Sequence, residues 1–372
     1  MPIEWRGRPA SAWLPDPLAQ LDLALSEPTV RATEQAAAAA RGGSDALPAR
    51  WEPLARLLLR AEGLASSHIE GVRAPLADVA AAELHPAGHD TAAWVADNLA
   101  AVTDALAEAR QRAPLRVESL HRWHRRLMAG ASSHLPTHQV GALRDAQGWI
   151  GGTSPLDAAL VPPPPEHVPA RLDDLVVFVN RADLDPVSQA ALAHAQLEVI
   201  HPYADGNGRV GRVLIGWVLT RRLMLVSPPP VSARIAVDRG GYLSGLTLFR
   251  LGQPDPWIRW FADVVRAAGQ ATTNLIRAVA DLQTSWDVRL TGVRAGAAAR
   301  RVLAVLPQYP VLDAATLAHA LGVSERASRT ALNTLAGHQI VAPFHPHGGA
   351  VGRPRQWWVA EELVDLVTAW SR

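Results

Sequence analysis

The chain has 372 residues, of which 48% are hydrophobic and 19% charged, a composition typical of a globular protein with two or three compact units. All 36 basic residues are arginine, which excludes a lysine-dependent site and a Walker A phosphate loop. The lack of cysteine excludes disulfides, a thiolate nucleophile and cysteine-ligated zinc, and a net charge of +1 excludes a strong overall attraction to nucleic acid or membrane.

Apolar segments are short throughout the chain. The amino terminus has none of signal-peptide length, and the longest run, near residues 213–219, is much shorter than a membrane span. We therefore expect no membrane contact. The cysteine-free composition is consistent with a reducing compartment such as the cytoplasm.

Helices are predicted for most of the first third of the chain. Residues 1–30 are rich in proline and tryptophan and predict a loop over a neighbouring surface, after which an alanine-rich stretch predicts a helix ended by Gly42 and Gly43. Apolar residues at 3–4 spacing predict an amphipathic helix whose buried face holds Leu54, Leu57, Leu58 and Ala61. Similar patterns predict helices at about residues 75–84, 90–112 and 116–129.

The segment 139–152, QVGALRDAQGWIGG, differs because short apolar pieces flank a polar turn, and this pattern predicts a β-hairpin. A helix is predicted after the proline run that begins at residue 162. Asp185 as N-cap and Pro186 in the first turn predict the start of a helix over 185–200, and another helix is predicted over 209–223.

The C-terminal part, after a helical stretch to about residue 290, has the pattern of a separate unit. Three short helices are predicted in RRVLAVLPQYP, LDAATLAHALG and SERASRTALNTLAGHQI, and a β-wing in the following twenty residues. Ser324 would cap the second helix of a helix-turn-helix. We therefore predict a winged helix-turn-helix at this end of the chain.

The loop HPYADGNGRVGR, residues 201–212, joins the two helices predicted at 185–200 and 209–223. It holds Gly206, Gly208 and Gly211 at the G-x-G-x-x-G spacing of a dinucleotide-binding turn. That turn follows a strand and needs an acidic residue about 20 positions later, whereas a helix precedes this loop and no such acid follows. The dinucleotide interpretation is therefore rejected.

The same loop brings together the groups that phosphoryl or nucleotidyl transfer needs. The free N–H groups at the start of the second helix attract an anion, and Arg209 and Arg212 share one helix face. Asp205 offers a hard oxygen ligand for Mg²⁺, and His201 is the group suited to accept a proton near neutral pH. The alternative is a glycine-rich turn with a solvated arginine pair and a capping aspartate.

The loop resembles the signature of the Fic-domain proteins, H-P-F-x-D/E-G-N-G-R-x-x-R, and departs from it only at Tyr203, where the family has Phe. The matching positions are His201, Pro202, Asp205, Gly206, Asn207, Gly208, Arg209 and Arg212. The resemblance implies an all-helical core, in a mainly α chain, that transfers AMP from ATP to a hydroxyl of a target protein.

The resemblance also implies a role for each residue of the loop. His201 would deprotonate the target hydroxyl and Asp205 would hold Mg²⁺. The α- and β-phosphates of ATP would bind to the region that starts at Gly206 and includes Asn207, Gly208 and Arg209, and Arg212 would hold the γ-phosphate.

Two further segments are similar to parts of that family. SSHIEG matches its inhibitory motif S/T-x-x-x-E-G/N with Ser66, Glu70 and Gly71, and the resemblance implies that Glu70 pairs with Arg212 and blocks the γ-phosphate. The predicted hairpin is similar to the flap that binds an extended target segment, through Gly141, Leu143, Arg144, Trp149 and Ile150. Glu70 as a solvated helix end and an ordinary surface hairpin are the alternatives.

Four parts follow from this comparison: an N-terminal helical region with the inhibitory motif (1–110), a Fic core (111–265), a helical linker (266–298) and the winged helix (299–372). In the last part Arg326, Arg329, Asn333, Arg353 and Arg355 could contact DNA. Seven arginines against five carboxylates over 299–372 make a weak electrostatic footprint, so protein docking is an equal alternative. Homodimers are common among Fic relatives.

Two functions therefore compete at this stage. The first is an autoinhibited transferase that moves AMP from ATP to a protein hydroxyl. The second is a DNA-binding regulator whose Fic core senses nucleotide or removes AMP from a modified protein. The histidine at position 201 favours the first, because a nucleotide sensor would not need a general base.

Overall fold

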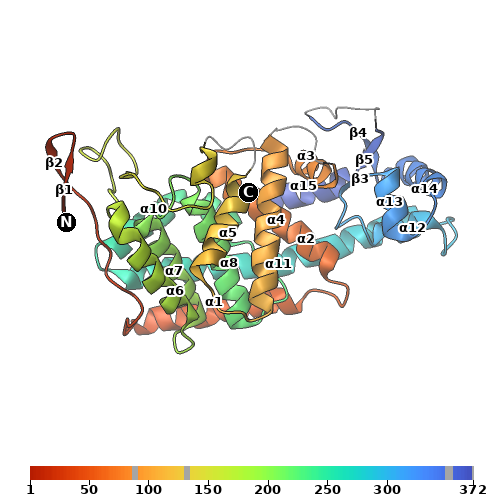
Figure 1. The fold of residues 1–372 in the computed structure, drawn as a ribbon. Helices are drawn as coiled ribbons and strands as arrows, with labels where there is room; N and C mark the ends of the chain where they lie inside the picture. The colour runs from red at the N-terminus through yellow and green to blue at the C-terminus, as the bar shows by residue number, and fades with distance from the viewer. Residues whose placement is uncertain (86–90, 130–134, 348–354, 371–372) are drawn as a thin grey trace.

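The computed structural model describes residues 1–85, 91–129, 135–347 and 355–370 (Figure 1). Helices make up most of this part of the chain, and its strands form one two-stranded and one three-stranded sheet. The expected mainly α fold is confirmed. None of the described helices is both long and apolar enough to cross a membrane.

The N-terminal segment begins with a small hairpin over residues 2–11, and only residues 12–26 form the expected loop. Strands β1 (Pro2–Trp5) and β2 (Arg8–Ser11) pair antiparallel. The two residues between them, Arg6 and Gly7, both have positive φ, which is the geometry of the tight turns that connect hairpin strands. Trp5 packs edge-on against Trp149, so the hairpin lies against the segment expected to form the flap.

Helices α1 (Glu27–Asp45) and α11 (Pro254–Arg289) pack closely along each other. The expectation that Gly42 and Gly43 end the first helix is wrong, because α1 continues through both. The reason is tertiary: a Cβ on Gly43 would lie 2.9 Å from the Gly269 carbonyl oxygen, and one on Gly269 would lie 2.5 Å from the backbone of Ala39. These glycines allow the two backbones to touch.

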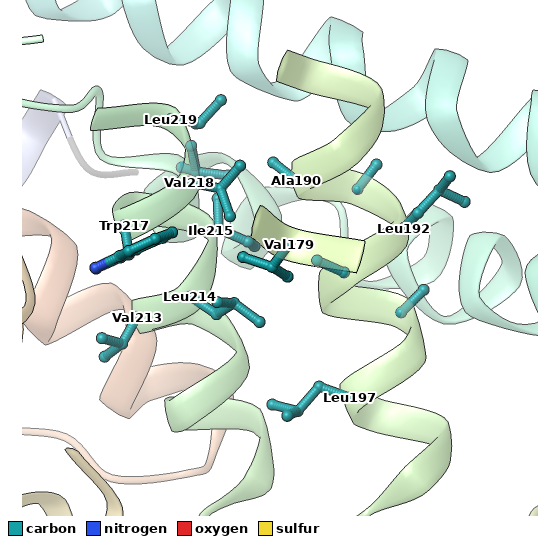
Figure 2. Close-up of a cluster of buried hydrophobic side chains, with 14 of the residues drawn as sticks. Val179, Ala190, Leu192, Leu197, Val213, Leu214, Ile215, Trp217, Val218 and Leu219 are labelled. Carbon is teal, nitrogen blue, oxygen red and sulfur yellow. The ribbon is translucent and has the colours of Figure 1, made fainter. Parts of the chain in front are cut away.

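The helices that carry the inhibitory motif and the loop follow the predicted order: α2 (Glu52–Ile69), α3 (Leu76–Leu84), α4 (Thr91–Arg110), α5 (Val117–Met128), α6 (Val168–Asn180), α7 (Pro186–Ile200), α8 (Asn207–Leu223), α9 (Val231–Val237) and α10 (Arg239–Arg250). Asp185 caps α7 by accepting from the Ser188 N–H, as expected. Helices α7 and α8 are buried on nearly all faces, and Figure 2 shows their apolar side chains between them with Val179 of α6 alongside. The loop 201–206 therefore sits on a rigid base.

The C-terminal elements are α12 (Ala298–Leu303), β3 (Val311–Asp313), α13 (Ala314–Leu321), α14 (Glu325–Gly337), β4 (Ala342–Phe344), β5 (Trp357–Val359) and α15 (Glu361–Trp370). The sheet is antiparallel with the order β3-β5-β4, and Ser324 caps α14 by accepting from the Ala327 N–H. This arrangement is compatible with the expected winged helix-turn-helix. Residues 348–354, which include Arg353, lie outside the described part of the chain.

Helix α11 connects the two ends of the molecule. It runs from the helical bundle toward α12–α14 without a break, so the expected boundary at residues 265 and 266 falls within one continuous helix (Figure 1). A single hydrophobic cluster joins the C-terminal half of α11 to α2 and to the C-terminal elements, through residues such as Leu57, Val279, Leu317 and Leu363. The C-terminal elements therefore pack directly against the helix that carries the inhibitory motif.

The close packing of α1 on α11 can be tested with two glycines, one that faces the backbone of the other helix and one that faces open space. Gly269→Ala places a methyl group against backbone and should lower the free energy of unfolding by about 1–3 kcal/mol, in spite of the better helix propensity of alanine. Gly42→Ala meets nothing within 4 Å and should be neutral or stabilising by up to about 1 kcal/mol. Urea unfolding of both variants provides the comparison; equal midpoints would contradict a backbone contact at Gly269.

Candidate active site

His201 lies at the C-terminal end of α7 in an unusual backbone conformation. Its φ of 49° and ψ of 60° place it in the left-handed region, where the chain turns out of the helix. The Arg144 side chain holds this turn: its Nε donates to the His201 carbonyl at 2.8 Å, and its other nitrogens donate to the carbonyls of Ala146 and Pro163. A buried arginine thus offsets the strain of the turn through several carbonyl contacts.

His201 lines a cavity that Glu70, Asp205 and Arg212 also line. Its Nδ1 lies 3.3 Å from the Glu198 carbonyl, which can only accept, so Nδ1 carries the proton and Nε2 the lone pair. Burial lowers the pKa of His201 to about 4, against a smaller opposing effect of that carbonyl. The imidazole is therefore neutral at pH 7, with Nε2 free to act as a base.

The loop after His201 is held by side chains that point inward. The Asn207 amide is buried and makes two bonds of 2.9 Å to the Tyr203 backbone, one from its Nδ2 and one to its Oδ1. Tyr203 is fully buried and stacks on His124 at 3.9 Å, and its hydroxyl lies 3.2 Å from His121 Nδ1. Tyrosine in place of the phenylalanine of the Fic signature therefore has a polar partner for its hydroxyl.

His124 was not predicted as a site residue, and the structure gives it a clear positioning role. Its Nε2 lies 3.0 Å from the Asp205 carbonyl, and its Nδ1 accepts from the Gly141 N–H at 2.8 Å. Burial lowers the pKa of His124 to about 4, which keeps the ring in the neutral form that can both donate and accept. His124 therefore ties α5, the loop and the start of segment 139–152 together. Its neighbours in the sequence, Arg122 to Arg126, provide no signal of this role.

Arg209 is buried beneath the loop with part of its hydrogen-bonding capacity unused. It stacks on Trp94 of α4 at 4.6 Å and lies 3.6 Å from Asp205. Within the described residues its Nε and Nη1 have no hydrogen-bond partner. Burial lowers the pKa of Arg209. A buried cation with unpaired donors is costly, so Arg209 is a candidate for pairing with an anion.

Arg212 and the inhibitory motif are in direct contact. The guanidinium donates to the Ser66 hydroxyl at 2.8 Å, to the Ser66 carbonyl at 3.1 Å and to Glu70 Oε1 at 2.6 Å. Burial alone would raise the pKa of Glu70, but the charge and hydrogen bond of Arg212 outweigh it and hold that pKa below its ordinary value. Residues 142 positions apart in the sequence thus form one charge-assisted pair.

A second carboxyl group, also not predicted, lies behind this pair. Glu198 faces the same cavity, and burial raises its pKa to about 7 despite the nearby Arg212 charge. The Tyr242 hydroxyl lies 3.4 Å from Glu198 and 2.9 Å from His194, whose pKa is lowered to about 3 by burial. His194 is itself fully buried.

The segment 139–152 is not the β-hairpin that the sequence predicts. It begins with a 3₁₀ turn, Thr137–Gln139, and its one β-bridge joins Ile150 to Leu160, ahead of a second 3₁₀ turn at Pro165–His167. The reversal occurs later because Gly151 and Gly152 have positive φ and Asp157 accepts from the backbone of Thr153 and Ser154.

The expected flap residues therefore divide into two groups. Trp149 and Ile150 line the cavity, and the Trp149 side chain is 38% exposed. Gly141 has a φ of +79° and packs against Arg125, Leu143 packs on the core, and Arg144 is buried beneath the loop. Arg144 thus supports the His201 turn instead of facing a target.

One cavity of about 660 Å³ collects most of the predicted site residues. Those that line it are Glu70, Trp149, Ile150, His201, Asp205, Gly206, Asn207, Gly208 and Arg212. Arg209 lies beneath the loop, and Ser66 lies behind Arg212. Gly71, with a φ of +83°, forms the turn that leaves α2. The fold and the site together describe a helical protein in which a neutral histidine and a buried arginine line one cavity.

Comparison with known proteins identifies the class. Residues 114–219 match the Fic/DOC family, so the chain contains a Fic domain. It is 29% identical over 179 residues to the protein adenylyltransferase fic-1 of Caenorhabditis elegans, covering 47% of this chain and 32% of that one. It is 31% identical over 163 residues to the protein adenylyltransferase Fic of Drosophila willistoni, covering 41% and 28%. The chain thus spans about a third of the length of these relatives.

The fold is also found in solved structures. A Fic family protein from Desulfovibrio desulfuricans G20 superposes with a TM-score of 0.55 at 22% identity, over 92% of this chain and 98% of that one. This similarity extends beyond residues 114–219, so the arrangement of helices outside the family match is also shared with that protein.

The environment of His201 predicts an unusual titration. We expect the His201 Cε1 resonance, identified by its loss in His201→Gln, to titrate with a midpoint near pH 4, since the buried ring has a pKa of about 4. The imidazole should stay neutral from pH 8 to pH 5. A midpoint at pH 6 or above would show that the ring is solvated and the geometry is wrong.

Proposed function

We propose that this protein is an autoinhibited adenylyltransferase that moves AMP from ATP to a hydroxyl side chain (Tyr, Thr or Ser) of a target protein or of itself. The observation that carries the proposal is the position of His201, Arg212 and Glu70 in one cavity. A neutral base stands beside an anion site whose arginine is occupied by an internal carboxylate. The names of the relatives support the same chemistry.

The proposed reaction assigns His201 the role of general base. Its Nε2 accepts the proton of the target hydroxyl while that oxygen attacks the α-phosphorus of ATP, and the bond from that phosphorus to the pyrophosphate breaks. A hydroxyl is a weak nucleophile at neutral pH, so proton removal contributes about 10²–10⁴-fold to the rate. The fixed tautomer of His201, set by the Glu198 carbonyl, keeps Nε2 available.

The anion site fits the phosphates of ATP. The two unpaired donors of buried Arg209 and the free N–H groups at the start of α8 call for a group with several acceptor oxygens. Gly206 takes a φ of +80°, which lets the backbone turn into α8 without a side chain in the way. Arg212 would bind the γ-phosphate when Glu70 moves away.

Asp205 is the residue that would hold Mg²⁺. Its side chain is 59% exposed and lines the cavity, with one oxygen accepting from the Gly206 N–H at 2.6 Å. A single carboxylate fits the way Mg²⁺ binds in phosphate sites, with substrate oxygens and water as its other ligands. Bound magnesium would neutralise phosphate charge, and the role of Asp205 would be to position the magnesium ion.

Glu70 would inhibit by competition for one guanidinium. Its carboxylate occupies Arg212 Nη2 at 2.6 Å, the position that a phosphate oxygen would need. Glu70 also lies against Gly208, where ATP would approach the backbone. ATP can therefore place its γ-phosphate on Arg212 only if the Glu70–Arg212 pair breaks.

Removing Glu70 should activate the protein. With labelled ATP and Mg²⁺, Glu70→Gly should raise AMP incorporation into the protein or a host lysate by about 10–100-fold, the range expected for losing one charge-assisted bond. Ser66→Ala, which removes only a neutral partner of Arg212, should give a smaller increase. Adding His201→Ala to Glu70→Gly should abolish the label while ATP still binds. An unlabelled Glu70→Gly protein that binds ATP would refute the transferase proposal.

A second candidate function, a DNA-binding regulator whose Fic core senses nucleotide or removes AMP, is favoured by one observation. Helix α14 presents Arg326, Arg329 and Asn333 to solvent on one face, as a recognition helix does. Against this, Arg329 pairs with Glu325, and Arg355 pairs with Asp313. Half of the expected surface charge is thus already neutralised within the protein.

The DNA proposal has a direct test. On this second proposal a duplex from upstream of the protein's own coding region is shifted in a gel at low salt. Arg326→Ala should then reduce the slope of log affinity against log salt by about one. Arg301→Ala, on α12 away from the exposed face of α14, is the matched control. No shift at low salt would exclude the DNA-binding function.

A further inference from the structure

The inhibitory residue Glu70 lies between two helices that also contact the C-terminal elements. Helix α2 ends at Ile69, immediately before Glu70, and α3 begins at Leu76. On one side, Leu57, Leu58 and Ala61 of α2 belong to the hydrophobic cluster that contains most of the C-terminal core. The position of Glu70 therefore depends on more than the Fic core.

Helices α2 and α3 are fastened to each other by charge. The Glu83 carboxylate of α3 is buried and pairs with both Arg56 and Arg60 of α2. Arg60 is itself buried, so separating the two helices would leave a charge without its partner. These ion pairs therefore hold α2 against α3. We call α2, the turn at Gly71 and α3 together the corner.

The corner packs against the sheet of the C-terminal elements. Ala77, Ala80 and Ala81 of α3 form an apolar cluster with Val311 of β3 and with Trp357 and Val359 of β5. His85, just after α3, lies 3.2 Å from Asp313 of β3. Small alanine side chains let the sheet approach α3 closely along its length.

One contact in this interface joins a buried residue to an exposed one. Asp78, in the first turn of α3, is 3% exposed, and its two carboxylate oxygens accept from the backbone N–H and the Nδ1 of His347, both at 2.9 Å. His347 itself follows β4 and its side chain is 87% exposed. A buried carboxylate thus accepts two hydrogen bonds from one surface residue of the C-terminal elements.

We infer that Asp78 and His347 are positioning residues for Glu70. The C-terminal unit holds α3 through Asp78, α3 holds α2 through Glu83, and α2 presents Glu70 to Arg212. This inference rests on the proposed function, because it explains how the inhibitory pair is kept in place. A loss of the Asp78–His347 contact shifts the balance toward the state in which Arg212 is free for phosphate.

His347→Ala is the central variant, since an exposed side chain can be removed with little risk to folding. It should raise AMP incorporation over wild type by about three- to tenfold, the ratio to which the loss of one hydrogen bond corresponds. His347→Asn keeps a side-chain N–H donor and should return the rate toward wild type. His345→Ala, at an exposed histidine two residues away, should leave the rate unchanged.

The same substitution in the Glu70→Gly background separates positioning from a general structural effect. There His347→Ala should change the rate by less than about 1.5-fold, because the residue it acts through is gone. Hydrogen exchange should also show faster exchange of amides 66–72 in His347→Ala, with α7 and α8 unchanged.

The outcomes are distinguishable. If Glu70→Gly incorporates no AMP, the proposed function fails. If Glu70→Gly is active but His347→Ala equals wild type, the Asp78–His347 contact does not position Glu70 and this inference is overturned. Equal activation by His347→Ala with and without Glu70 would likewise overturn it, because the effect would bypass the inhibitory residue.

Discussion

The structure around the candidate site depends on the burial of the Arg212 guanidinium. Arginine stays charged under all ordinary conditions, so a buried one must have a partner. In this structure the partners are Ser66 of α2 and Glu70 just after α2, and Arg212 is 3% exposed. Any ligand that binds Arg212 must replace them, and a phosphate can do so because it offers oxygens of the same geometry and charge. On the proposed function, inhibition and substrate binding are therefore two ways to meet one electrostatic requirement.

The need to pair buried polar groups also explains how the chain is organised around α7 and α8. These helices are buried on nearly every face, so the loop between them cannot shift easily, and polar side chains hold its shape. Asn207 closes the loop on Tyr203, His124 fixes the Asp205 carbonyl, and Arg144 fixes that of His201. Each group faces inward with its bonds made. The groups left facing the cavity are the His201 imidazole and the Asp205 carboxylate.

Much of the site could be predicted from the sequence because its central part is local. The spacing of His201, Asp205, Arg209 and Arg212 across a helix-loop-helix places them together by backbone geometry alone. The predictions that failed required knowledge of distant partners. The glycine pair in α1 looks like a helix end until Gly269 of α11 is placed against it. The turn expected within 139–152 lies nearer 151–159 because Asp157 organises it.

The sequence by itself determined the helical class, the order of the helices and the catalytic loop, since each of these depends on residues close together in the chain. The tertiary structure alone decided which histidine fixes the loop, and that Arg144 supports His201 from beneath. The tertiary structure also placed α2, the helix that ends just before Glu70, between the Fic core and the C-terminal elements. The physical reason is that burial selects partners by proximity in space, and a charge taken out of water is satisfied by whichever group the packing brings to it.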